Sequence, residues 1–369
     1  MSDHLGRRRR QARLPLGRVF LLIAALLPVA YALTLPEPSR PESDPGHIAP
    51  RPTPATWSGP APVKTPARLP DATTYTPRVF ISGAESVGTA ETVDHAFLRV
   101  LAVTAGRVAE LRRVPAADLP QFDGFAVSGD TVVWAESVSR ANASVRTTLW
   151  RASWKAGSKG TQIPATTGEA VFLGGPYDLV VQAGRVSWAA TAGTATEIRS
   201  VALTGGTVTT KRLEGDFQLT APPWVVSVGA GRGVPVQLID LTTNRKVTVP
   251  TNAAEVAECG PTLCRMGVIN NNTLARIDLQ RPDGTERRRI AGNEATPVTT
   301  EVALLDRFVA LKTDTGRGVG LSLYDLRSGR TDLVAVDVAN VQGRDALLWW
   351  STGSGDDLVW NALDLRVLG

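Results

Sequence analysis

The chain has 369 residues, a formal net charge of +5 at pH 7 and two cysteines. Residues 1–18 contain six arginines and one aspartate, so this segment accounts for the whole net charge and residues 19–369 are neutral overall. A neutral folded region has no field that would attract phosphates, which argues against nucleic acid as a partner. The length is compatible with two average domains or with one large all-β repeat domain.

An uncharged apolar run extends from Val19 to Leu35 and contains one proline, Pro28. Its 17 residues are near the lower limit for a membrane-spanning helix, and the preceding arginines should keep residues 1–18 in the cytoplasm. We therefore expect a single-pass signal anchor at residues 19–35, with the rest of the chain outside the cell membrane. A cleaved signal peptide is the alternative, because Ala30 and Ala32 form a small-x-small pattern, and the protein would then be secreted.

Residues 36–77 contain 12 prolines among serine, threonine, alanine and arginine. Such a composition cannot bury enough apolar surface to offset the entropy lost on ordering. It is typical of an extended, polyproline-like spacer. We therefore expect a disordered linker that holds residues 78–369 at a distance from the membrane.

From residue 78 onward, short β-branched and aromatic runs alternate with turn signals, which predicts an all-β fold. A small or acidic residue, a hydrophobe and a turn residue recur at intervals of 38 to 51 residues. Strand-like repeats of this length are typical of β-propeller blades. The repeats are Ala102–Gly106, Ser153–Gly157, Ala202–Gly206, Asp240–Asn244, Asp278–Gly284, Leu323–Gly329 and Asp364–Leu365.

A second strand is predicted upstream of each of the last six repeats, with tryptophan or a large aliphatic residue packed between blades. Five of these residues stand 14 positions before the small or acidic residue of the following repeat. The sixth, Trp134, fits this spacing if its unit carries five extra residues. The six are Trp134, Trp188, Val226, Cys264, Leu311 and Trp350. Burial between sheets is a sufficient structural reason for such side chains.

The innermost strand of each blade is expected just before the second strand, separated from it by the short turn of a hairpin. The runs that fit are Phe125–Val127, Leu179–Val181, Gln218–Leu219, Val302–Leu304 and Val338–Val341. This gives units near 78–116, 121–165, 173–214, 216–250, 254–292, 299–336 and 337–369.

Two of these units are incomplete in the sequence. The last unit ends where its fourth strand should begin, and residues 83–93 of the first unit read as a polar loop. A propeller must close to protect its sheet edges. We therefore expect an N-terminal strand such as Arg78–Ser82 to complete the last blade. Seven blades are favoured, and six remain possible.

These hairpins resemble those of membrane-anchored extracytoplasmic β-propellers of the TolB-like and WD40-like groups. The Trp-Asp and Gly-His pairs of a true WD40 blade are absent from the sequence. The resemblance implies a platform for proteins, peptides or glycans, and no catalytic residue is carried over. The expected function is therefore a tethered binding or scaffolding module. A propeller hydrolase or lyase acting on cell-wall polysaccharide, with carboxylates at the channel mouth, is the alternative.

Cys259 and Cys264 flank a Gly-Pro turn, where a disulfide can join two strands of a hairpin in an oxidising compartment. Their spacing does not fit a zinc site, and we expect neither a metal nor a cofactor. His95 has no recognisable nucleophile motif beside it, so no catalytic residue is predicted.

Arg232 and Arg317 each stand in a Gly-Arg-Gly-Val sequence, eight residues before Asp240 and Asp325 respectively. Both are predicted on loops between second and third strands, where an anionic ligand could be bound. Ordinary solvated loop arginines shared through repeat ancestry are the alternative interpretation.

Overall fold

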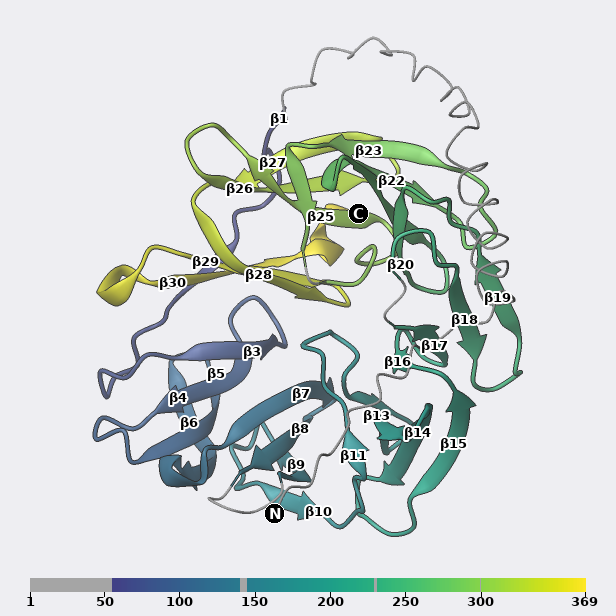
Figure 1. Ribbon diagram of the computed structural model, residues 1–369. Helices are drawn as coiled ribbons and strands as arrows, with labels where there is room; N and C mark the ends of the chain where they lie inside the picture. Colours follow the sequence, from purple (N-terminus) through teal and green to yellow (C-terminus); the bar gives the residue numbers. More distant parts are fainter. Residues whose placement is uncertain (1–54, 140–144, 229–230, 299) are drawn as a thin grey trace, which may run out of the picture. The chain divides into compact units, whose positions relative to one another are not determined.

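The computed structural model describes residues 55–139, 145–228, 231–298 and 300–369, which form a seven-bladed β-propeller (Figure 1). The predicted tail, the predicted membrane segment and residues 36–54 of the predicted linker lie outside the described residues. Among the residues described, no helix is both long and apolar enough to span a membrane. The favoured count of seven blades is confirmed.

Within each blade, paired strands that follow one another in the chain are antiparallel and run from the innermost strand outward, while two N-terminal strands are added at the outer edges of the sixth and seventh blades. The first three blades consist of β3 (Thr76–Phe80), β4 (Ser86–Glu91), β5 (Phe97–Thr104) and β6 (Arg107–Pro115); β7 (Gln121–Ser128), β8 (Thr131–Val138), β9 (Arg146–Ser153) and β10 (Thr161–Ile163); and β11 (Glu169–Ala170), β12 (Val180–Gln182), β13 (Arg185–Ala192), β14 (Ala195–Ala202) and β15 (Thr209–Glu214). In the third blade β11 and β12 both pair with β13, so they share the innermost place.

The remaining four blades continue around the ring in chain order. They consist of β16 (Phe217–Leu219), β17 (Trp224–Ser227), β18 (Val236–Asp240) and β19 (Lys246–Val249); β20 (Glu255–Cys259), β21 (Cys264–Asn270), β22 (Thr273–Gln280) and β23 (Arg288–Gly292); β24 (Ala295–Pro297), β25 (Phe308–Asp314), β26 (Val319–Asp325) and β27 (Arg330–Ala335); and β28 (Val338–Arg344), β29 (Leu347–Thr352), β30 (Val359–Asp364) and β2 (Val63–Pro66). The strand β1 (Ala55–Thr56) pairs in parallel with β27.

The ring closes in the seventh blade, where β2 pairs antiparallel with β30 and supplies the missing fourth strand. The sequence therefore correctly predicts that an N-terminal strand closes the ring, but it predicts the wrong strand. The segment Arg78–Ser82 was expected there, whereas β3 is the innermost strand of the first blade. Residues 55–77, which the sequence assigns to the linker, instead contribute β1 and β2 to the outer edges of two blades. Because two exposed edges gain partners, these residues are ordered despite their composition.

Each pair of neighbouring blades encloses a hydrophobic cluster, which is where the core lies. The predicted second-strand residues are all buried in these clusters. Trp134 and Trp188 are 0% exposed and Trp350 is 1% exposed. At the closure the Phe80 and Trp349 rings lie 5.6 Å apart, and the Trp360 indole donates to the main-chain oxygen of Tyr75.

Acids at the ends of three third strands explain the repeat that marks the sequence. Asp240, Asp325 and Asp364 each accept a hydrogen bond from a main-chain N–H two residues onward, which fixes the following turn. Asp325 is also paired with Arg307 through two hydrogen bonds of 2.9 Å, and this pairing lowers its pKa to about 2.

Two further strand predictions fail. Residues Ser86–Glu91 form the buried second strand of the first blade, although their small side chains made the sequence look like a loop. Residues 302–304 are not the innermost strand of the sixth blade, because that place belongs to β24. They lie in the connection to β25, where Val302 and Ala303 pack into the cluster between the fifth and sixth blades and Leu304 packs into the cluster between the sixth and seventh.

Candidate functional site

A cavity of about 130 Å³, here called the polar cavity, is lined by the innermost strands β3, β7 and β28 and by residues 174–178. Each of the three strands carries a register shift in the stretch that reaches the cavity. A β-bulge turns a side chain out of its regular alternation, and bulges are common beside functional sites. The fold therefore directs otherwise ordinary strand residues into one space.

Asp123 lies at the bulge of β7 and lines the polar cavity together with Arg78 from β3. Burial raises the pKa of the Asp123 carboxyl, and the nearby Arg78 guanidinium opposes that shift. Gly124 follows with a φ of +55°, and a Cβ there would approach the Leu179 side chain to 2.8 Å. A glycine is therefore required for the second and third blades to meet at this bulge.

Asp178 stands two residues after the segment Gly174-Gly175-Pro176, just before β12. Its carboxylate accepts a hydrogen bond of 2.7 Å from the main-chain N–H of Gly174. Burial raises the pKa of Asp178 in spite of main-chain hydrogen bonds that oppose the shift, and the negative charge of Asp123 raises it further. Two half-buried carboxyl groups thus interact within one cavity.

A second cavity of about 180 Å³, here called the apolar cavity, lies between the third and fourth blades. Tyr177 and Asp178 line it, and Asp178 also lines the polar cavity. Several of the remaining side chains are aliphatic or aromatic: Val171, Leu173, Phe217, Leu219 and Val228. Asp178 therefore stands at the junction of a charged space and a mainly apolar one.

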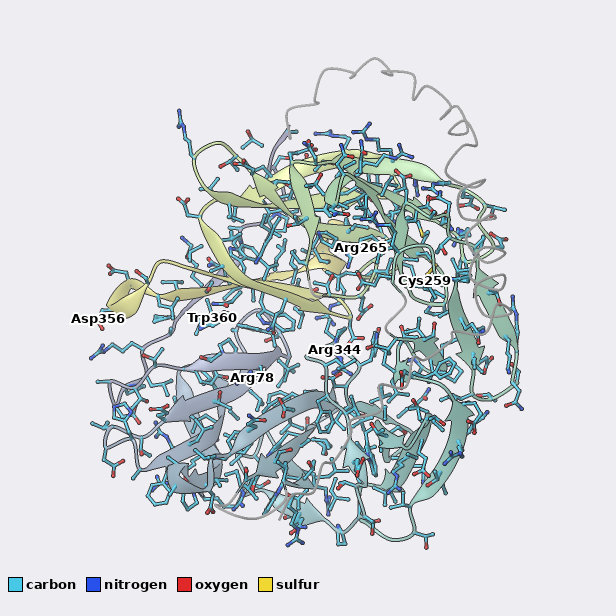
Figure 2. All side chains as sticks on the ribbon, in the orientation of Figure 1. Arg78, Cys259, Arg265, Arg344, Asp356 and Trp360 are labelled. Carbon is cyan, nitrogen blue, oxygen red and sulfur yellow. A yellow bond between two sulfur atoms is a disulfide. The ribbon has the colours of Figure 1, made fainter. Side chains whose placement is uncertain are left out.

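Arg344, the last residue of β28, forms a fixed wall of the polar cavity (Figure 2). Its guanidinium donates to the main-chain oxygen of Phe125 at 2.7 Å and to that of Leu179 at 3.4 Å. These carbonyls belong to the second and third blades, so one side chain connects three blades. Its charge is also met by Asp345 at 3.7 Å.

Glu301 contacts the residue that follows Arg344: it accepts a hydrogen bond of 2.5 Å from the main-chain N–H of Asp345. Burial raises the pKa of Glu301 to about 7; the Asp345 charge adds to the shift, while hydrogen bonds and Arg344 oppose it. Tyr177 is hydrogen-bonded to Glu301, and burial together with that carboxyl raises the phenol pKa. Arg344 thus lies next to a cluster formed by Glu301, Tyr177 and Asp345, in which Glu301 can be protonated near neutral pH.

The two arginines predicted to bind a ligand do not lie at these cavities. Arg232 is on the β17–β18 loop and Arg317 on the β25–β26 loop, so their predicted placement between second and third strands is confirmed. They belong to the fourth and sixth blades, which the fifth blade separates. Arg232 donates to Asn272 at 2.9 Å on the blade between them. Their role in ligand binding stays a prediction.

The predicted disulfide is confirmed: Cys259 and Cys264 are bonded to each other across the β20–β21 hairpin, where they are register partners. His95 lies on an exposed turn and pairs with Glu91. Within the described ranges, no group of three or more histidine, cysteine, aspartate or glutamate side chains is placed to hold a metal ion.

Sequence reasoning missed Asp123, Asp178, Glu301 and Arg344. A glycine directly follows Asp123, and two glycines and a proline stand shortly before Asp178. These pairings were the available signal, since glycine permits bulges and close approach. Nothing local in the sequence connects them with Arg344, because the ring brings together residues more than 160 positions apart.

No protein-family model and no curated protein matches the chain. Among solved structures, a puromycin-hydrolyzing peptidase of Mycobacterium tuberculosis is 16% identical with a TM-score of 0.53, and the match covers 84% of this chain and 55% of that one. An uncharacterized protein of Listeria monocytogenes is 9% identical with a TM-score of 0.51, covering 81% and 93%.

The acylaminoacyl peptidase of Pyrococcus horikoshii is 9% identical with a TM-score of 0.47, covering 67% of this chain and 45% of that one. The chain therefore spans about half the length of these two peptidases. At such identities, likeness establishes the fold alone. The expected resemblance to propeller domains is confirmed as architecture: this chain is a seven-bladed β-propeller.

Proposed function

We propose that the protein is an extracytoplasmic binding module, tethered to the cell membrane by residues 19–35, whose ligand occupies the polar and apolar cavities. The observation that carries this proposal is Arg344, which holds the polar cavity between three blades. A preformed cavity with a few convergent polar groups and perturbed carboxyls is the usual form of a ligand site. Fixing its walls before binding lowers the entropy cost of association.

Two features support the location. The disulfide between Cys259 and Cys264 suits an oxidising compartment outside the cytoplasm. The arginines of residues 1–18 precede an apolar run, as in a single-pass protein with a cytoplasmic N-terminus. Residues 36–54 remain, as a proposal, the spacer between membrane and propeller.

The test fills the polar cavity with a side chain and leaves the rest of the surface unchanged. Gly175 lines this cavity, has no left-handed φ, and a Cβ placed there meets only Asp178, at 3.7 Å, so Gly175→Phe begins from an unstrained Cβ position. Gly231, beside Arg232 on the loop face, has open space around it and gives the matched control Gly231→Phe. Full-length protein in detergent is immobilised and exposed to a mixture of bacterial cell-wall fragments, and retained species are identified by mass spectrometry.

Species retained by the wild type and by Gly231→Phe, but lost from Gly175→Phe, are expected. Equal retention by Gly175→Phe and the wild type would overturn the cavity as the site. Selective loss from Gly231→Phe and from the Arg232→Ala/Arg317→Ala double variant would instead assign the binding to the loop face predicted from the sequence.

A hydrolase or lyase acting on cell-wall polysaccharide is the second candidate, favoured by one observation. Asp123 and Asp178 line one cavity, and burial raises the pKa of each, as a general acid requires. This candidate predicts that the wild type releases reducing sugar ends from the polysaccharide and that Asp178→Asn does not. Absence of release by the wild type would exclude it.

A further inference from the structure

A third cavity, here called the tryptophan cavity, lies between the fourth and fifth blades and shares no lining residue with the polar or the apolar cavity. Its volume of about 410 Å³ exceeds that of both and falls within the range of roughly 300–1,000 Å³ that is typical of small-molecule sites. The fourth blade contributes Trp224 and the β18–β19 turn, and the fifth blade contributes the β20–β21 turn and the β22–β23 loop. The cavity is therefore large enough for a ligand of its own.

Trp224, the first residue of β17, supplies an aromatic surface to this cavity. Its side chain is half-buried and packs against the hydrophobic cluster between the fourth and fifth blades. Leu238 and Val247 from the same blade also line the cavity. An aromatic ring supported by aliphatic side chains favours a flat, apolar group on the ligand.

Arg245 stands beside this surface without an acidic partner. Its guanidinium lies 5.9 Å from the centroid of the Trp224 ring, and within the described ranges it takes part in no ion pair. The side chain is exposed and lines the cavity. A guanidinium binds a carboxylate through two parallel hydrogen bonds, which is the strongest polar contact that this side chain can make with a small ligand.

The other charged groups of the cavity are already engaged. Arg281 pairs with Glu286 at 3.1 Å. The Asp283 carboxylate accepts hydrogen bonds from the main-chain N–H and the hydroxyl of Thr285, at 2.9 and 2.6 Å. Among the charged lining residues, Arg245 is therefore the one that a ligand can bind without breaking an existing pair, and it favours a negative charge.

The β20–β21 turn forms a fixed part of the lining. It contributes Pro261 and Thr262, and the disulfide closes the hairpin on both sides of them. The Thr262 hydroxyl donates to the Asp306 carboxylate at 2.5 Å, and the main-chain oxygen of Thr262 accepts from Arg281 at 3.4 Å. Because the turn is held before binding, a ligand loses little affinity to ordering it.

The lining offers few hydrogen-bond donors. The hydroxyls of Thr262 and Thr285 both donate to carboxylates, and Pro261 and Pro282 have no N–H. A sugar brings several hydroxyl groups, each of which needs a partner when it leaves water. The cavity therefore favours an aromatic ring over a sugar ring.

We propose that the tryptophan cavity binds an aromatic carboxylate, with the ring of the ligand against Trp224 and its carboxylate on Arg245. A free aromatic acid and a peptide that ends in an aromatic residue share this chemistry. The site is separate from the polar and apolar cavities, so the inference goes beyond the proposed function and does not depend on it.

The test uses isothermal titration calorimetry on the full-length protein in detergent. The wild type should bind N-acetylphenylalanine at least about tenfold more tightly than the neutral N-acetylphenylalaninamide, the scale of one charged hydrogen bond. N-acetylalanine has the carboxylate without the ring and should bind several times more weakly than N-acetylphenylalanine. A fourth probe, 3-phenylpropionate, has only ring and carboxylate: affinity equal to that of N-acetylphenylalanine supports a free acid as the ligand, and weaker binding supports a peptide C-terminus.

Three variants assign the two contacts. Arg245→Gln should weaken binding of N-acetylphenylalanine by about tenfold or more and make the acid and the amide bind equally. The matched control is Lys246→Gln, which removes the same charge from the next residue, an exposed side chain that does not line the cavity, and it should stay within about twofold of the wild type. Trp224→Leu should weaken the acid and the amide by the same factor, since both carry the ring.

Equal affinity of the wild type for the acid and the amide, or wild-type affinity in Arg245→Gln, would overturn the proposal. The same loss in Arg245→Gln and Lys246→Gln would overturn it too, because the attraction would then be a general effect of surface charge. Tighter binding of glucuronic acid than of N-acetylphenylalanine would show that the site recognises a saccharide instead. Arg245 is on an exposed turn, so these outcomes can be read even if Trp224→Leu fails to fold.

Discussion

Arg344 on the innermost strand of the seventh blade donates a hydrogen bond of 2.7 Å to the main-chain oxygen of Phe125 on the innermost strand of the second blade. The first blade lies between these two in the ring, so the contact joins blades that are not neighbours. The interior of this propeller is therefore connected by a side chain in addition to the clusters between neighbouring blades.

Replacing Arg344 with methionine should lower the free energy of unfolding by roughly 2–3 kcal/mol. Hydrogen bonds to a charged group contribute about 1.5–3 kcal/mol, and two carbonyl acceptors would lose their donor. Urea unfolding followed by tryptophan fluorescence measures the change. Arg330→Met is the control, because Arg330 is 64% exposed and its pairing with Asp332 is long at 3.5 Å. Equal effects of the two variants would show that the connection between blades adds nothing.

Trp188 and Trp134 provide a matched pair for the cost of one hydrogen bond. Both are 0% exposed at equivalent places in neighbouring blades. The Trp188 indole donates to the main-chain oxygen of Thr167 at 2.8 Å, whereas that of Trp134 has no acceptor among the described residues. Trp188→Phe should therefore destabilise the fold by about 1–2 kcal/mol more than Trp134→Phe. Identical midpoints in urea would contradict this assignment.

Reduction of the disulfide should destabilise the fifth blade moderately. Closing the short loop between Cys259 and Cys264 contributes roughly 2 kcal/mol on the chain-entropy estimate. A thermal melt with and without reductant should show a lower Tm in the reduced wild type. The Cys259→Ala/Cys264→Ala variant should melt at one temperature in both conditions. A shift in that variant would point to an effect of the reductant elsewhere.

Stability should depend on pH through Glu301. Its folded-state pKa is about 7, above the ordinary value of 4.5, so the folded state binds this proton more tightly than the unfolded state does. The stabilisation is complete below about pH 4.5 and is lost as the pH rises through 7. The difference in unfolding free energy between the wild type and Glu301→Gln should therefore change by on the order of 3 kcal/mol across this window, to the disadvantage of the wild type at higher pH.

Comparison over this window isolates Glu301, because Asp123 and Asp178 are present in both proteins. Glutamine retains an oxygen that can accept from the Asp345 N–H. A constant difference between the two proteins from pH 4 to 8 would mean that the pKa of Glu301 is the same in the folded and unfolded states.

The blades could be predicted because each contains its own local signature. The turn acids Asp240, Asp325 and Asp364 and the interblade tryptophans act within about 20 residues of chain, a range over which spacing is informative. The second strand of the first blade was missed because Ser86–Glu91 is buried through small side chains, which carry no strong strand pattern.

The closure and the cavities depend on distant contacts that no local pattern encodes. β2 was hidden in a proline-rich stretch, where composition favours disorder and only the free edge of β30 provides a partner. The polar cavity combines bulges on three strands with an arginine from the opposite end of the domain. Arg232 and Arg317 were noticed because their surroundings repeat, and repetition reports ancestry more directly than it reports binding.

The order in which the chain enters the ring has a mechanical consequence. The first strands after the N-terminal segment are β1 and β2, which border the sixth and seventh blades. Tension applied through that segment would strip β1 from β27 and then β2 from β30, before any complete blade is pulled apart. Detachment of β2 from β30 is thus the first substantial barrier to unfolding under force. The force at which β2 detaches sets the mechanical stability of the domain.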